Sequence, residues 1–87
     1  MYNPLLDTFL TVVDCGSFTN AADKLFLSPT AVMKQMNALE THMNLQLIER
    51  TSTGVSPTHA GKVIYRDAKF IKDYSEKSIA AAMDFSE

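Results

Sequence analysis

A chain of 87 residues with a hydrophobic fraction of 46% and a formal net charge of −2 suits one small globular domain whose core is too modest for a deep catalytic cleft. We expect that the chain is not an enzyme, because no pair of acids, no nucleophile with its base and no glycine-rich phosphate loop occurs. Cys15 is the single cysteine, and His42 and His59 are isolated. We therefore expect no disulfide, no metal site and no cofactor. No apolar run approaches the ~18 residues of a membrane span and the chain begins without a basic signal segment, so we expect a cytoplasmic protein with no membrane partner.

The first two predicted helices are marked by their caps. Asn3 precedes Pro4, and proline suits the first helical position because the missing N–H has no partner there. Gly16 supplies a left-handed end, and Ser17 can cap the second helix. Apolar residues recur at helical spacing, namely Leu6, Phe9, Leu10 and Val13 in the first helix and Phe18, Ala21, Ala22 and Leu25 in the second. Phe26 and Leu27 then form a short corner.

The third helix, expected over 28–43, begins at Ser28 and Pro29, which repeat the signal of a cap followed by proline. At about 100° per residue, the side expected to be buried carries Val32, Met36, Leu39 and Met43. The opposite side, expected to be exposed, carries Thr30, Met33, Lys34, Asn37 and Thr41. Small or flexible side chains with a single charge suit contacts to DNA bases, although an ordinary solvated face is an alternative explanation.

A hairpin and a long helix complete the chain. Asn44 is expected to end the third helix in the left-handed conformation. A two-stranded hairpin, or wing, follows over about 47–57, with its turn at 51–54 and Pro57 at a strand end. Thr58 caps a last helix that runs to about residue 83 and is roughly 38–40 Å long at ~1.5 Å per residue. Its apolar positions exceed what so small a core can bury and predict a partner helix. Those expected to pair are Ile64, Ile71, Tyr74 and Ile79.

This order of elements predicts a mainly α fold, a winged helix-turn-helix of three helices and a two-stranded wing followed by a long dimerisation helix. We expect residues 1–57 to form the winged domain, with the helix-turn-helix at about 18–37, and residues 58–87 to form a linker helix. Four stretches, GSFTNAADKL, LSPTAVMKQMNALE, LIER and THAG, resemble the signature of the LysR-type transcriptional regulators in order and in spacing. The resemblance runs from about Leu5 to Ala68, and four linked motifs seldom arise by chance.

The resemblance implies a bacterial, homodimeric regulator that binds specific double-stranded DNA with the third helix in the major groove. The residues it assigns to DNA binding are Ser28, Pro29, Thr30, Met33, Lys34, Asn37, Arg50 and Thr53. The wing around Arg50 to Gly54 would contact the DNA backbone or the minor groove, and the last helix would pair two chains. Positions that would pack the domain are Ala22, Leu25, Gln35, Leu39, Leu47 and Ala60.

The resemblance also implies a missing part. Members of this family continue into an effector-binding domain, so the simplest explanation is that the sequence is a piece of a longer regulator. A small-molecule effector is therefore expected only in the absent C-terminal domain.

Charge and two departures from the family pattern leave an alternative open. Residues 1–57 carry three cations against five acids, whereas domains that bind nucleic acid are often basic. Met33 replaces the serine that is common at its position, and Thr53 replaces an arginine or lysine at the wing tip. The alternative is a protein-interaction module on a winged-helix scaffold, with weak or no DNA binding.

Overall fold

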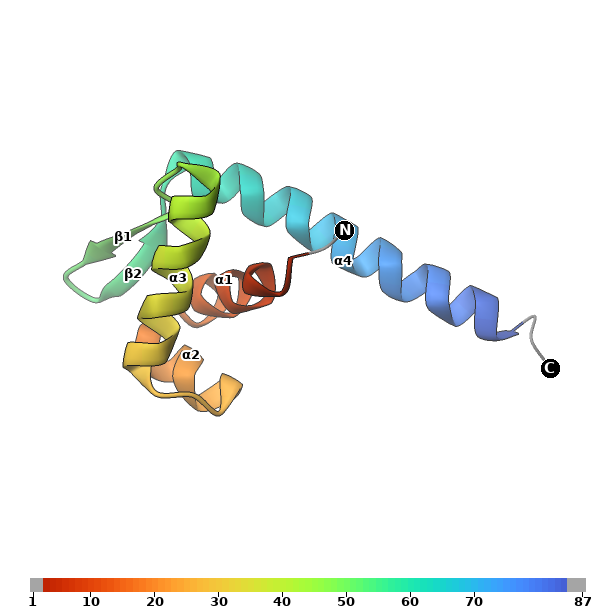
Figure 1. Cartoon of the computed structure of the whole chain (residues 1–87), viewed down its shortest axis with the longest axis horizontal. Coiled ribbons are helices and arrows are strands. Elements are labelled where there is room, and N and C mark those ends of the chain that lie inside the picture. The colour runs from red at the N-terminus through yellow and green to blue at the C-terminus, as the bar shows by residue number, and fades with distance from the viewer. Residues whose placement is uncertain (1–2, 85–87) are drawn as a thin grey trace.

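The computed structural model describes residues 3–84, which form four helices and a two-stranded antiparallel hairpin. In chain order the elements are α1 (Pro4–Cys15), α2 (Phe18–Leu25), α3 (Pro29–Met43), β1 (Ile48–Thr51), β2 (Gly54–Pro57) and α4 (His59–Asp84). The first three helices form a body with the hairpin on one side, and α4 extends away from it (Figure 1). The predicted winged helix-turn-helix is confirmed. Residues 85–87, the end of the segment expected over 58–87, lie outside the described residues.

The helix ends follow the capping signals of the sequence. The four predicted caps each accept a hydrogen bond from a backbone N–H in the first turn of their helix, at 2.9–3.1 Å: Asn3, Ser17, Ser28 and Thr58. Gly16 and Asn44 end α1 and α3 in the left-handed conformation, with φ of 67° and 55°. Phe26 ends α2 in the same conformation, with φ of 57°, although the sequence indicated only a corner there.

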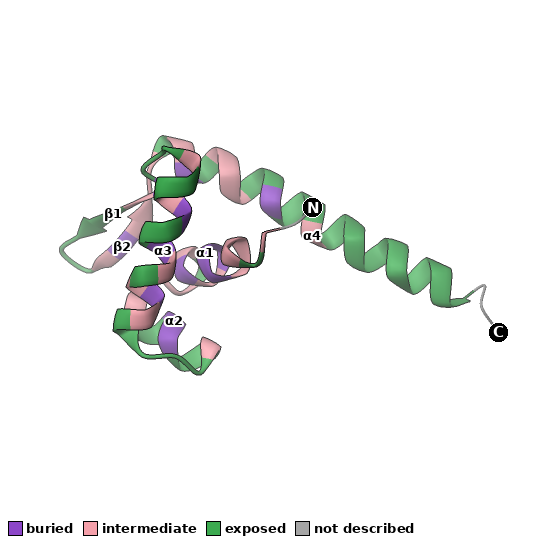
Figure 2. Cartoon of the chain, viewed as in Figure 1, coloured by how far each residue is buried: buried purple, intermediate pink, exposed green. Residues whose placement is uncertain are grey.

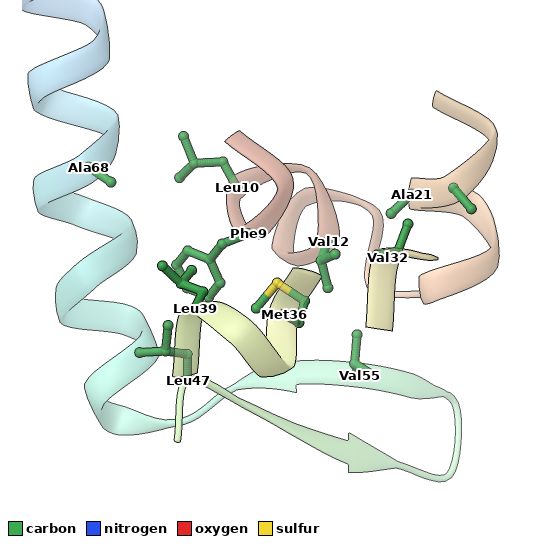
Figure 3. Packing of buried hydrophobic residues seen from close by; sticks show 11 residues of the cluster. Phe9, Leu10, Val12, Ala21, Val32, Met36, Leu39, Leu47, Val55 and Ala68 are labelled. Atoms are coloured by element: carbon green, nitrogen blue, oxygen red, sulfur yellow. The ribbon is translucent and has the colours of Figure 1, made fainter. Parts of the chain in front are cut away.

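The hydrophobic core surrounds α1, which contacts α2, α3, α4 and β2 (Figure 3). Its largest fully buried side chains are Phe9, Val12, Val32, Met36, Leu39 and Leu47. The buried face predicted for α3 is confirmed, except that Met43 in the last turn is only half-buried. Val12 lies outside the stripe predicted for α1, yet it is fully buried because neighbouring elements cover α1 on more than one side.

The wing is attached to the helical body by backbone contacts. Arg50 pairs with Val55 in the register of the two strands. The backbone N–H of Val55 also donates to the carbonyl of Gly16 at 2.9 Å, so β2 pairs with the connection between α1 and α2. Gly54 has a φ of 147°, and a Cβ at this position would fall on the Gly16 carbonyl oxygen. The wing therefore has a defined position relative to the helices.

The first half of α4 belongs to the core, and the second half does not. Gly61 and Ala68 are buried, and Ile64 and Tyr65 pack against the core. The expectation that Ile64 is an unburied position is therefore wrong, because α1 covers this part of α4. From residue 73 to 84 every residue of the helix is exposed, as Figure 2 shows. No helix within the described residues is long and apolar enough to cross a membrane.

Candidate nucleic-acid interface

The outer face of α3 presents uncharged polar side chains and one cation to solvent. Thr30, Lys34, Asn37 and Thr41 are all exposed, as the helical spacing predicts. The opposite side of the same helix is anchored in the core by Val32, Met36 and Leu39. Because this anchoring fixes the rotation of α3 about its axis, the four exposed side chains have a defined direction.

The start of α3 is an exposed helix N-terminus. Ser28, Pro29 and Thr30 are exposed, and the Ser28 hydroxyl accepts from the Ala31 N–H at 3.1 Å, which leaves its own O–H free to donate. The N-terminus of a helix carries a partial positive charge and unpaired N–H groups, which favour anions such as phosphate. The end of α3 that begins the exposed face therefore suits a nucleic-acid backbone.

Met33 is half-buried, so the expectation that it is an exposed residue is wrong. Its sulfur accepts from an Arg50 Nη at 3.7 Å, and the guanidinium carbon of Arg50 lies 5.2 Å from the centroid of the Phe18 ring. Helical spacing within α3 could not reveal this, because Phe18 comes from α2 and Arg50 from β1. Phe18 was assigned only to packing from the sequence.

Glu40 joins the last turns of α3 to the wing. One of its carboxylate oxygens accepts from the backbone N–H groups of Leu47, at 2.6 Å, and Ile48, at 3.2 Å. Ile48 is the first residue of β1 and Leu47 precedes it. The carboxylate therefore fixes the start of the wing relative to α3. This role was not predicted from the sequence. The available signal was that Glu40 is the one acidic residue of α3.

A groove of about 210 Å³ lies between α3 and the wing. Met33 and Asn37 line it from α3, and Gln46, Ile48 and Arg50 line it from the wing side. The wing tip itself, at Ser52 and Thr53, is exposed and carries no charge. The cation of the wing is Arg50, whose pair with Val55 lies next to the one that closes the turn, and its side chain reaches Met33 of α3.

No group of three or more His, Cys, Asp or Glu side chains that could hold a metal ion occurs within residues 3–84. The apolar residues expected to pair along α4 are largely exposed beyond the core, with Ile71 at 51%, Tyr74 at 64% and Ile79 at 59%.

The exposed face of α3 and the adjoining wing are supported by one core. This arrangement is that of a winged helix-turn-helix protein. Residues 4–62 match the family described as bacterial regulatory helix-turn-helix protein, lysR family. The chain belongs to this LysR family, as its sequence signature predicted.

Individual relatives agree with this assignment. The nitrogen assimilation regulatory protein nac of Escherichia coli (strain K12) is 41% identical over 73 residues, which cover 84% of this chain and 24% of that protein. The crystal structure of the BenM DBD/benA site 1 DNA complex matches with a TM-score of 0.89 and 30% identity, over 95% of this chain and 93% of that one. Full-length LysG from Corynebacterium glutamicum matches with a TM-score of 0.85 and 34% identity, over 97% of this chain and 29% of that one. The chain thus spans about a quarter of the length of the nac protein.

Proposed function

We propose that this chain is the DNA-binding and dimerising part of a bacterial LysR-type transcriptional regulator. The observation that carries the proposal is the exposed face of α3 beside a wing whose arginine adjoins that face. The BenM match is to a complex with DNA, and in that fold class the helix that enters the major groove is the second of the helix-turn-helix. Here this helix is α3.

Each exposed side chain has a role that its chemistry allows. Lys34 would donate to guanine O6 or N7, and Asn37 would pair with the edge of adenine. Ser28, Pro29 and Thr30 would approach phosphates and base edges at the helix start. The remaining proposed DNA-binding residues, Met33, Arg50 and Thr53, lie in or beside the wing. The wing would contact the DNA backbone or the minor groove.

The long helix α4 would pair two copies of the chain. Ile71, Tyr74 and Ile79 are exposed apolar side chains of α4 that suit a partner helix, as are Phe70 and Met83. Ile64 would contribute only what the core leaves exposed. A two-fold dimer would read two half-sites about 34–36 Å apart or a multiple of that distance. In the whole regulator, a small-molecule effector would bind outside residues 3–84, and the cytoplasm would be the site of action.

The test is a selection of genomic DNA fragments by the purified chain, followed by fluorescence anisotropy on the enriched sequence. Asn37→Ala should cost ~1–3 kcal/mol on that sequence and much less on random DNA. Lys34→Ala should weaken both, because lysine also serves phosphates. Lys77→Ala removes the same charge from the exposed half of α4 and is the matched control. A chain that enriches no sequence would favour the protein-interaction alternative.

A further inference from the structure

Three side chains from three elements meet where the wing faces α2 and α3. Arg50 extends from β1, its guanidinium carbon lies 5.2 Å from the ring centroid of Phe18 at the start of α2, and one Nη donates to the sulfur of Met33 in α3 at 3.7 Å. The resemblance assigned Arg50 and Met33 to DNA as separate contacts. In the structure they form one cluster, which we call the arginine cradle (Phe18, Met33 and Arg50).

The cradle restrains the arginine without neutralising its charge. An aromatic face attracts a guanidinium through the ring quadrupole, and a thioether is only a weak acceptor of an N–H. No ion pair of Arg50 occurs among the described residues, although Glu40 and Glu49 also line the groove beside it. A guanidinium has five N–H donors, and most of them therefore stay available to an anion.

The position of the arginine cradle indicates which anion Arg50 would bind. The groove beside it is lined by Asn37 of the exposed α3 face, whereas the wing tip at 52–53 carries no charge. Arg50 thus lies between the helix that would enter the major groove and the wing that would follow the backbone. A phosphate at the edge of the major groove would lie within reach of both elements, and arginine suits a phosphate through parallel N–H donors.

We propose that Phe18 and Met33 are positioning residues that hold the Arg50 guanidinium ready for one backbone phosphate of the bound DNA. Met33 then acts through Arg50 and not by touching a base. This proposal rests on the proposed function, because it specifies how one cation of that surface is used.

The free chain provides the first measurement. The Nε–H resonance of Arg50 should be shifted upfield by the Phe18 ring and should move back in Phe18→Leu. The sequence has two arginines, and the Nε–H of Arg66, which donates to Asp67 at 3.1 Å, serves as the control within the same spectrum. An Arg50 resonance that does not respond to Phe18→Leu in a folded variant would overturn the cradle.

A double-mutant cycle provides the second measurement. Arg50→Ala should weaken preferred and random DNA alike and reduce the slope of log affinity against log salt by about 0.9 per protomer, as expected for one lost phosphate contact. Met33→Leu keeps a similar apolar volume and removes the sulfur, and it should weaken binding about two- to fivefold when Arg50 is present. In an Arg50→Ala background it should have no effect. Met43→Leu makes the same exchange at the far end of α3 and is the control.

The outcomes separate the two proposals. A wild-type chain that binds no DNA overturns the proposed function and this inference together. A wild-type chain that binds, with Met33→Leu equally harmful in both backgrounds or changing only the sequence preference, overturns the inference alone and returns Met33 to a base contact. Thermal melting of each variant checks folding, and if Phe18→Leu does not fold, Met33→Leu still decides the result.

Discussion

Thr53 is exposed at the tip of the wing, in the turn that joins β1 to β2. If the wing lies against the DNA backbone, a cation here adds a phosphate contact. We expect Thr53→Arg to tighten binding to all sequences and to steepen the salt dependence by about one unit per protomer. Salt titrations by anisotropy would measure both quantities. Ser78→Arg on the exposed half of α4 adds the same charge elsewhere, and an equal effect from it would mean that net charge alone is responsible.

The pKa of Tyr65 reports on a contact between α4 and α1. Its hydroxyl donates to an Asp14 carboxylate oxygen at 2.6 Å. This hydrogen bond raises the pKa of Tyr65 above its ordinary value, with smaller contributions from desolvation and from the charges of Asp14 and Asp73. Because the folded chain prefers the protonated phenol, the stabilisation is complete below about pH 10, the ordinary pKa of tyrosine, and is lost as the pH rises through the higher pKa of the folded state.

Phenolate absorbance during an alkaline titration tests this hydrogen bond. Asp14→Asn should lower the pKa of Tyr65, and Tyr65→Phe identifies which transition belongs to this residue. The loss of folding stability above pH 10 should also be smaller in Tyr65→Phe. An Asp14→Asn variant with an unchanged tyrosine titration would contradict the hydrogen bond as the main cause.

At the scale of elements, Gly61 marks a close approach of α4 to the backbone of Leu47. The Thr58 N–H donates to the Leu47 carbonyl at 3.0 Å, and a Cβ at Gly61 would fall on the same carbonyl oxygen. In an open helix position, glycine to alanine stabilises by about 1 kcal/mol. Here we expect Gly61→Ala to destabilise the fold by about 1–3 kcal/mol, as overpacking does.

Denaturant unfolding measures the effect of Gly61→Ala. Ser75→Ala, at an exposed position of the same helix, is the control for helix propensity alone. A Gly61→Ala variant as stable as the control, or more so, would show that α4 does not approach Leu47 so closely.

At the scale of the whole molecule, the exposed half of α4 predicts a dimer. Ile71 and Ile79 are 51% and 59% exposed, and burying one such side chain is worth ~1.5–3 kcal/mol. We expect the chain to sediment as a dimer and the double variant Ile71→Asp with Ile79→Asp to sediment as a monomer. Ala80→Asp is the control. At about 100° per residue, position 80 lies on the opposite side of α4 from Ile71. A wild-type chain that remains monomeric at high concentration would refute the pairing.

The local features of this fold were predictable from sequence because local interactions determine them. A polar cap before a proline and an apolar residue at every third or fourth position act within one or two helical turns. For this reason the helix order, the caps at Ser17 and Ser28, the hairpin and the exposed side of α3 apart from Met33 agree with the sequence. The four linked motifs likewise indicated the LysR family, which the comparison with its members confirmed.

The contacts between distant segments were decided by the tertiary structure. Met33 accepts a hydrogen bond from Arg50, 17 positions away, and Glu40 accepts from backbone groups beyond its own helix. Ile64 is covered because α4 lies against α1 at the other end of the chain. Side-chain periodicity reports which face of a helix is apolar, but not which neighbour covers it or how far along the helix the cover extends. Those properties follow only when the elements pack around one core.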